Sequence, residues 1–159
     1  MKIRLADTRG FCAGVDRAIE IVKKVLELNG APVYVKHEVV HNKTVVNELK
    51  SLGVIFVEEV EEVPNGEIVI YSAHGVSKVV ETDSHAKELE VFDATCPLVS
   101  KVHAEVNTYA KLGYDCLLIG HLNHPEVEGT MGQFDTSHGG SITLIETLED
   151  VKSLKFKNG

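Results

Sequence analysis

The sequence predicts an α/β fold made of small, mostly parallel sheets flanked by helices. Two observations favour this class: segments of β character alternate with segments of helical period, and strand segments such as EIVIYSAHG are too uniformly apolar to have one face in water. The composition agrees, because 43% hydrophobic and 25% charged residues in a chain of 159 residues are typical of a globular protein. This length accommodates one ordinary domain or two small ones.

The first half of the chain is expected to alternate strands and helices. Residues 2–7, KIRLAD, form the first predicted strand, and the helix that follows ends at Asn29-Gly30, a usual C-terminal signal. Its apolar face repeats at helical spacing in Val15, Ala18, Ile19, Val22, Val25 and Leu26. Further strands are expected at residues 32–40, 54–59 and 67–75, with helices at residues 42–53 and through the 80s.

The second half repeats this strand-to-helix pattern. Residues 91–96, VFDATC, are expected to form a strand leading into a helix, with Pro97 in the first turn, where its missing N–H costs nothing. The remaining predictions are strands at residues 114–121 and 141–147, a loop or short helix at 124–132 and a helix at 148–154. The recurring strand–Cys–helix pattern indicates a domain boundary near residue 95.

Charge and composition exclude several classes of function. The formal net charge is −8 and no cluster of Lys and Arg interrupts that acidity, so nucleic-acid binding is not expected. No apolar run approaches the roughly 18 residues that span a bilayer, and MKIRLADTRG lacks the apolar core of a secretory signal. Three cysteines without a close pair fit a reducing compartment. The chain is therefore expected to be cytoplasmic, with no membrane partner.

Two of the cysteines occupy equivalent local positions. Cys12 and Cys96 each follow an extended segment and open a helix, where unpaired N–H groups and the helix dipole lower a thiol's pKa and favour the thiolate. Thiolates bind soft metals, so the pair is a candidate ligand set, although free cysteines are also commonly small buried apolar residues. Cys116 lies inside an apolar strand segment and is expected in the core.

Histidines supply a second candidate site. His41, His74 and His124 follow predicted strands, and ligands of open α/β sheets collect outside the carboxyl ends of strands. Converging imidazoles donate hydrogen bonds and carry positive charge near neutrality, so they suit a phosphate or diphosphate; taken singly, each is more simply a polar surface residue. Glu126, on the same loop as His124, is the candidate acid, with Glu128 as an alternative and a solvated loop carboxylate as the simpler reading.

Five motifs follow one another along nearly the whole chain: RGFCAGVDRAI, HEVVHN, SAHGVS, DATCPLVSKVH and GHLNHPEVEGTMGQ. Together they resemble the amino-terminal half of the 4-hydroxy-3-methylbut-2-enyl diphosphate reductase family, an iron–sulfur enzyme family that ends the non-mevalonate isoprenoid pathway. The resemblance implies that Cys12 and Cys96 are cluster ligands. It also implies that His41, His74 and His124 hold the substrate diphosphate and that Glu126 belongs to a proton relay.

The same resemblance implies a domain organisation. The family has three pseudo-equivalent α/β lobes around its cluster, and this chain is expected to contain two of them, the second incomplete. Residues 1–13 would be the first strand and the cluster loop, which pack with the missing third lobe; residues 14–95 would be the first lobe and residues 96–159 the truncated second lobe. The third cluster cysteine of the family is absent, because Cys116 matches no family ligand.

The implied mechanism needs partners beyond this chain. In the family, three cysteines hold a [4Fe–4S] cluster with one iron open to the allylic diphosphate substrate, and a ferredoxin or flavodoxin delivers two electrons. Loss of the substrate hydroxyl as water gives isopentenyl or dimethylallyl diphosphate. With one ligand missing, we expect a truncated gene product or one piece of a split enzyme whose companion polypeptide supplies the rest, with little activity alone.

Two alternatives from other functional classes remain open. A binding module would keep the histidine cluster for diphosphates and hold no iron–sulfur cluster. A metal-dependent hydrolase would use His121, His124 and Glu126 with zinc or manganese. The hydrolase hypothesis leaves both helix-opening thiols unexplained.

Overall fold

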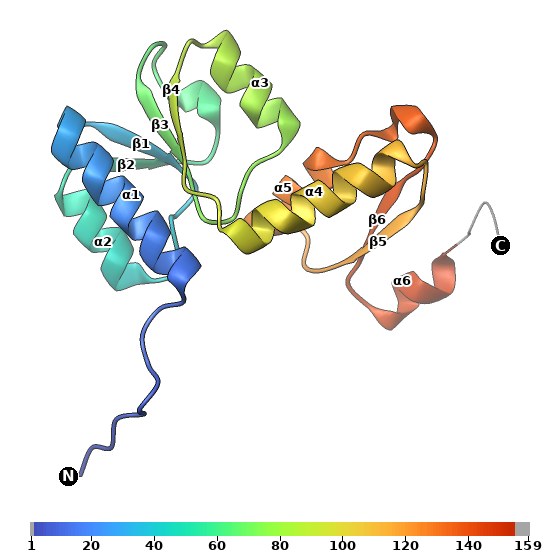
Figure 1. Cartoon of the computed structure of the whole chain (residues 1–159), viewed down its shortest axis with the longest axis horizontal. Helices are drawn as coiled ribbons and strands as arrows, with labels where there is room; N and C mark the ends of the chain where they lie inside the picture. The colour runs from blue at the N-terminus through green and yellow to red at the C-terminus, as the bar shows by residue number, and fades with distance from the viewer. Residues whose placement is uncertain (1, 155–159) are drawn as a thin grey trace.

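The computed structural model describes residues 2–154 and contains two parallel sheets joined by a long helix (Figure 1). Within this part of the chain, one sheet has four strands in the order β2-β1-β3-β4 and the other has two strands, β5 and β6. The strands are β1 (Val33–Lys36), β2 (Val54–Val57), β3 (Ile68–Tyr71), β4 (Glu90–Asp93), β5 (Cys116–Ile119) and β6 (Ile142–Ile145). The predicted α/β class with parallel sheets is confirmed.

The helices alternate with the strands along the chain, as the sequence periodicity predicts. They are α1 (Ala13–Asn29), α2 (Lys43–Ser51), α3 (Lys78–Ala86), α4 (Pro97–Lys111), α5 (Pro125–Gln133) and α6 (Leu148–Ser153), with short 3-10 turns at Val60–Glu62 and Thr136–His138. The last five residues of the predicted second lobe, 155–159, lie outside the described residues, as does residue 1. No helix within residues 2–154 is both long and apolar enough to cross a membrane.

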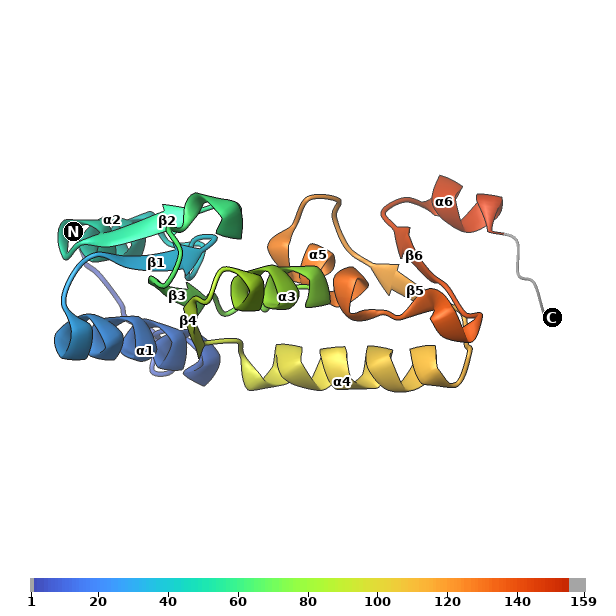
Figure 2. The same ribbon diagram turned by 90° about the horizontal axis from the view of Figure 1, so that it is seen from above.

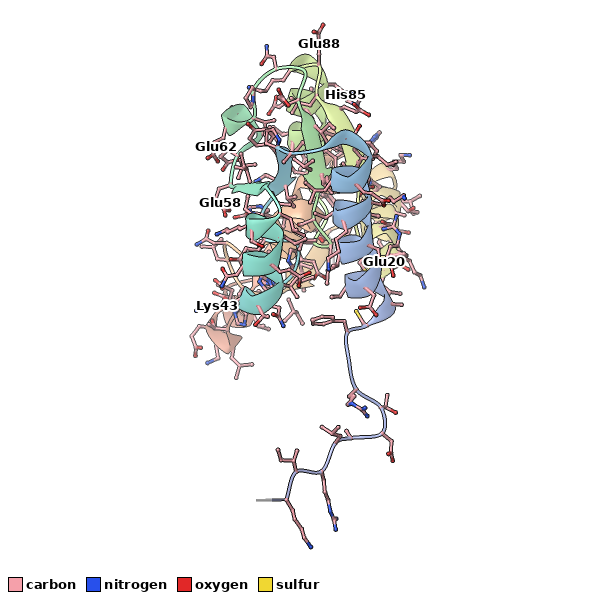
Figure 3. The ribbon with its side chains drawn as sticks, turned by 90° about the vertical axis from the view of Figure 1, so that its left-hand side faces the viewer. Glu20, Lys43, Glu58, Glu62, His85 and Glu88 are labelled. Carbon is pink, nitrogen blue, oxygen red and sulfur yellow. The ribbon has the colours of Figure 1, made fainter. Side chains whose placement is uncertain are left out.

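Helices cover both faces of the four-stranded sheet, which explains why its strands are apolar on both sides. On one face, α1 and α2 pack against alternate residues of the central strands, including Val35 and Ile70, and this layer forms the main core. On the other face, α3 and the Val60–Glu62 turn cover Val69 and Tyr71. Figure 3 shows α1 and α2 side by side, with their N-terminal ends at the same end of the molecule.

Helix α4 connects the two sheets. It begins directly after β4 and extends to the two-stranded sheet, and Figure 2 shows it running alongside α3 and α5. Helix α5 packs against both α3 and α4. All strands of the larger sheet precede residue 95 and the described strands of the smaller one follow it. The division into lobes at residues 14–95 and 96–159 nevertheless stays a prediction.

The predicted first strand and the ends of several other predicted strands differ in the structure. Residues 2–12 form neither helix nor strand; they are exposed and lead away from the sheets (Figure 1), because among residues 2–154 no strand lies beside KIRLAD to accept its backbone hydrogen bonds. Strand β1 ends at Lys36 rather than continuing through residue 40, because His37 adopts a left-handed backbone with φ of 60°.

Cys116 is only half-buried at the start of β5, so its expected place in the core is not reached. The sheet has two strands within the described residues and leaves one face of β5 open, with Ile119 83% exposed. Partial burial, followed by the Asp115 carboxylate, raises the pKa of the Cys116 thiol. This thiol therefore stays protonated at neutral pH, unlike a metal ligand.

Candidate functional site

Cys12 and Cys96 are the N-cap residues of α1 and α4, as the sequence predicts. Both have non-helical backbone angles, with ψ of 160° and 131°, and within the described structure neither side chain makes a capping hydrogen bond. Cys12 is exposed and Cys96 is half-buried. Each sulfur therefore lies beside the positive end of a helix dipole without making a local hydrogen bond, which leaves it free to bind another group.

The two sulfurs meet beside Gly14, in the first turn of α1. A Cβ atom added to Gly14 would lie 2.6 Å from the sulfur of Cys96 and 3.9 Å from the sulfur of Cys12. Both sulfurs thus lie within 4 Å of one point, although they come from different helices. The close approach requires glycine, because any larger residue would occupy the space that the Cys96 sulfur fills.

This donor pair suits a soft metal centre but is not a complete ligand set. Two cysteine sulfurs at helix N-termini match the type of ligand that iron–sulfur clusters require. Residues 2–154 contain no group of three or more His, Cys, Asp or Glu side chains arranged to hold a metal ion. Cys12 and Cys96 would accordingly be two of the ligands of a shared centre, and further donors would have to come from outside these residues.

The three predicted histidines converge. The ring centroids of His41 and His74 lie 4.6 Å apart, those of His41 and His124 lie 5.3 Å apart, and those of His74 and His124 lie 5.7 Å apart. His41 follows β1, His74 follows β3 and His124 follows β5, so each residue lies beyond the carboxyl end of a strand. We call these three residues the histidine cluster.

Helix α5 brings His124 to the other two histidines, although β5 belongs to a separate sheet. A Cβ atom on Gly129 would lie 3.3 Å from the carbonyl oxygen of Gly75, and one on Gly132 would overlap the side chain of Ser77. These glycines let α5 pack directly on the turn formed by residues 72–77, which carries His74 and which we call the 72–77 turn. His124, at the N-cap of α5, then lies against His74.

His74 is the buried member of the histidine cluster. It is 9% exposed, and its Nε2 atom has no hydrogen-bond partner in the described structure. Burial is the main cause that lowers its pKa to about 4, and the charges of His41, His124 and His37 lower it further. The ring is therefore neutral at pH 7 and has a buried polar atom available for a ligand.

The capping of α5 determines how His124 presents its ring. Its Nδ1 atom accepts a hydrogen bond from the backbone N–H of Glu126 at 3.2 Å, so the proton of the neutral ring is assigned to Nε2. The preceding residue, Asn123, has a φ of 65°, which turns the chain sharply at this point. His124 thus has an N–H group free to donate to an anion.

The structure separates the two glutamates that the sequence left as alternatives. Glu126 lines a largely apolar cavity of about 380 Å³ together with His124. Glu128 lines a different cavity of about 290 Å³, together with Lys36, His37 and residues 75–77. The geometry therefore associates Glu126, rather than Glu128, with the histidine cluster.

The hydrolase hypothesis gains no support from the geometry. The side chain of His121 is 88% exposed and its Nδ1 atom lies 3.9 Å from a carboxylate oxygen of Glu146. His121, His124 and Glu126 line one cavity, yet the described residues include no three-residue metal-binding group.

A link between the thiol pair and the histidine cluster was missed by reasoning from sequence. The backbone N–H of Cys96 donates a hydrogen bond of 3.0 Å to the carbonyl oxygen of Ala73, the residue before His74. The role of Gly14 could not be predicted from the sequence either, because a pair of glycines such as Gly10 and Gly14 is a weak signal. The close approach of backbones that explains both features is visible only in three dimensions.

Comparisons with known proteins show the family of this chain. The family described as LytB protein matches residues 3–158. A relative from Pseudomonas savastanoi pv. phaseolicola, named 4-hydroxy-3-methylbut-2-enyl diphosphate reductase, is 63% identical over 158 residues, which is 99% of this chain and 50% of that protein. A relative of the same name from Azotobacter vinelandii is 61% identical over the same shares.

Solved structures give the same result. The structure of the E-1-hydroxy-2-methyl-but-2-enyl-4-diphosphate reductase from Plasmodium falciparum superposes with a TM-score of 0.88 at 47% identity, covering 94% of this chain and 46% of that one. A second reductase structure, described as the terminal enzyme of the non-mevalonate pathway, has a TM-score of 0.77 at 40% identity, covering 91% of this chain and 50% of that one. The chain spans about half the length of the curated relatives it matches. Because the match extends over nearly every residue and the predicted site residues converge, this chain belongs to the LytB protein family.

Proposed function

We propose that this chain takes part in the reduction of 4-hydroxy-3-methylbut-2-enyl diphosphate, the activity named for its relatives. The observation that supports this most directly is the junction of two sites. The histidine cluster, suited to a diphosphate, is joined to the thiol pair, suited to an iron–sulfur centre, by the 3.0 Å hydrogen bond from Cys96 to Ala73. A reductase of an allylic diphosphate needs both groups next to each other.

The histidine cluster would bind the diphosphate group. His124 would donate from Nε2, while His41, the exposed member, would supply a further N–H. His74 would donate from its buried nitrogen, and a bound anion would raise its pKa by offsetting the charges of its neighbours. Three donors held by the fold would anchor the substrate and orient its allylic end.

Cys12 and Cys96 would hold two corners of a [4Fe–4S] cluster, with a third thiolate from a companion polypeptide or another part of a longer protein. When bound, the cluster would supply the electrons of the reaction one at a time. The unused thiols, the helix dipoles and the close packing at Gly14 fit such a group. A ferredoxin or flavodoxin would serve as electron donor.

Glu126 would handle protons. The reaction breaks the bond between carbon and the hydroxyl oxygen, takes up two electrons and two protons, and releases water. One proton leaves with the oxygen and the other is added to either end of the allylic fragment, which gives isopentenyl or dimethylallyl diphosphate. Glu126 lines the same cavity as His124, which supports a role in delivering a proton next to the anchored substrate.

A diphosphate-binding module without a cluster is the second candidate. It is favoured by one specific observation: the described residues bring together three imidazoles but only two thiols. This candidate shares the anion site with the first and differs only in the absence of redox chemistry. For either candidate we expect a reducing compartment such as the cytoplasm, because the thiols must remain free.

Anaerobic purification distinguishes the two candidates. For the reductase we expect a brown protein with bound iron and sulfide, loss of colour in Cys12→Ser and Cys96→Ser, and little turnover by the chain alone because its ligand set is incomplete. A colourless protein that binds inorganic pyrophosphate in calorimetry would favour the binding module. Full reductase activity of the isolated chain would contradict the expectation of an incomplete site, and absence of pyrophosphate binding would contradict both candidates.

A further inference from the structure

Unpaired polar atoms gather at the 72–77 turn. Within residues 2–154, the buried side-chain nitrogen and oxygen atoms that lack a hydrogen-bond partner are Ser72 Oγ, His74 Nε2 and His103 Nε2. Ser72 and His74 belong to this turn, and His103 packs against it from α4. Buried unpaired groups are uncommon and each requires an explanation. His74 has one in the proposed anion site, whereas His103 has none so far.

His103 packs against the 72–77 turn at Gly75, the residue after His74. Gly75 has a φ of +74°, and a Cβ atom there would lie 2.7 Å from Cε1 of His103, closer than to any other atom. The same Cβ would lie 3.1 Å from Cγ2 of Thr95 and 3.3 Å from Cγ1 of Val99. The first two turns of α4 thus form a surface against which the backbone of Gly75 rests.

Helix α5 holds the turn as well. Gly129 of α5 packs against the carbonyl group of Gly75, and Nε2 of Gln133 donates a hydrogen bond of 2.9 Å to the carbonyl oxygen of Val76. The backbone that follows His74 is therefore clamped by contacts from both α4 and α5. Removing one side of the clamp would let the turn, and with it the imidazole of His74, move away from the other two histidines.

His103 acts on the turn as an uncharged group. It is 9% exposed, and burial lowers its pKa, with Glu81, Glu126 and Asp93 opposing this shift. Behind its ring lies a cavity of about 280 Å³ lined by polar groups that include Tyr71, Asn107 and Gln133. The ring therefore packs against the turn and also borders this cavity.

We propose that His103 is a positioning residue, whose ring holds the 72–77 turn so that His74 stays within the histidine cluster. The proposal rests on the proposed function for the identity of the anion, and it deepens that function by naming what sets the affinity of the site. Cys96 is the N-cap residue of the same helix, so the contact of His103 with the turn also relates the position of the anion site to that of the thiol pair.

Two substitutions separate packing from hydrogen bonding. His103→Ala removes the ring, so we expect pyrophosphate affinity measured by calorimetry to fall about fivefold or more. His103→Phe keeps a ring against Gly75 and beside the adjoining cavity, so we expect affinity within about twofold of the unsubstituted chain. The matched control is His85→Ala, because His85 is exposed in the last turn of α3 and lies at the end of the molecule opposite Lys43, the first residue of α2 (Figure 3).

Amide hydrogen exchange tests the same idea without any ligand. In His103→Ala, we expect the amides of residues 73–77 to exchange about tenfold faster, whereas His103→Phe and His85→Ala leave them unchanged. If the unsubstituted chain does not bind pyrophosphate, the proposed function fails while the exchange measurement still decides the role of His103. Unchanged exchange and affinity in a folded His103→Ala variant would overturn the inference, and so would loss of affinity in a folded His103→Phe variant.

Discussion

At the scale of single residues, His74 is a neutral ring with a buried nitrogen, which suits the proposed anion site. Burial removes water from the imidazole, and its neighbours His41 and His124 add repulsion to a second positive charge. The ring is therefore uncharged at neutral pH, and its buried Nε2 atom has no hydrogen-bond partner in the described structure. An unpaired buried nitrogen is destabilising, and a ligand that forms a hydrogen bond with it would remove this penalty.

The titration of His74 can be measured directly. Imidazole resonances in NMR should give this residue a pKa of about 4 in the free chain, and pyrophosphate should raise the value. His41→Ala, which removes a neighbouring charge, should raise it without ligand. A pKa near 6.5 in the free chain would contradict the burial argument.

The same shift predicts how stability depends on pH. The pKa of His74 is lower in the folded chain than its usual 6.5, so the unfolded chain binds more protons between about 4 and 6.5. The free energy of unfolding should therefore fall as the pH is lowered through this range. Urea denaturation at a series of pH values measures the slope, which should become smaller in His74→Gln; an equal slope in both proteins would argue against this assignment.

Gly14 matters at the same scale, because it has no Cβ atom and so leaves room for the sulfur of Cys96. Gly14→Ala places a Cβ atom 2.6 Å from the sulfur of Cys96, so the two sulfurs should be pushed out of their arrangement. We expect about tenfold weaker Cd²⁺ binding, measured by the thiolate-to-metal absorption band. Helix α1 itself should be retained, because alanine favours a helix over glycine by about 1 kcal/mol.

Cys116→Ser is the control for this experiment. Its thiol lies in β5 and takes no part in the pair, so the Cd²⁺ band should be unchanged. Equal Cd²⁺ affinity in Gly14→Ala and the unsubstituted chain would show that the close contact at Gly14 is not needed.

At the scale of elements, helix α5 packs against the 72–77 turn through two of its glycines. Gly129 and Gly132 let it approach the 72–77 turn closely enough for His124, its N-cap residue, to reach His74. Glycine in the middle of a helix is unfavourable by itself, so close packing must compensate for it. The histidine cluster therefore depends on how this helix packs as well as on its own residues.

Gly132→Ala tests this dependence. The added Cβ atom would overlap the side chain of Ser77, and overpacking costs about 1–3 kcal/mol, partly offset by about 1 kcal/mol from helix propensity. We expect lower stability in urea denaturation and weaker pyrophosphate binding in calorimetry. Adding Ser77→Gly to this variant removes the overlap and should restore both properties; no recovery in the double variant would mean that the contact does not position α5.

At the scale of the whole molecule, the two sheets differ in how completely they are covered. The four-stranded sheet has helices on both faces, whereas β5 of the smaller sheet leaves Leu117 and Ile119 exposed to 47% and 83%. Both strands of this small sheet are edge strands within the described residues (Figure 1). Open edges and apolar side chains together favour association with other chains.

Self-association of the isolated chain should therefore depend on concentration. We expect sedimentation velocity to show larger species as concentration rises, and Ile119→Lys to reduce them, because a lysine on an exposed strand opposes edge pairing. Val79→Lys, at a site on α3 that is 65% exposed, is the matched control and should have no effect. A single species of constant size at all concentrations would contradict this prediction.

Much of the fold follows from local patterns that the sequence carries. The helix starting after Cys12 and the one starting after Cys96 form as predicted, because the apolar spacing, Gly30 at the end of α1 and Pro97 at the start of α4 each act within one helix. The failure at KIRLAD has a non-local cause: the segment has the pattern of a strand, but a strand requires a neighbour that the described residues do not supply.

By itself, the sequence determined the α/β class, the helix-opening cysteines and the histidines that end strands, because periodicity and capping are properties of short segments. Only the tertiary structure decided that the sulfurs of Cys12 and Cys96 meet beside Gly14 and that His124 joins two histidines of another sheet. These distances depend on how closely helices and turns pack. Such packing joins residues far apart in the chain, and short-range patterns carry no record of it.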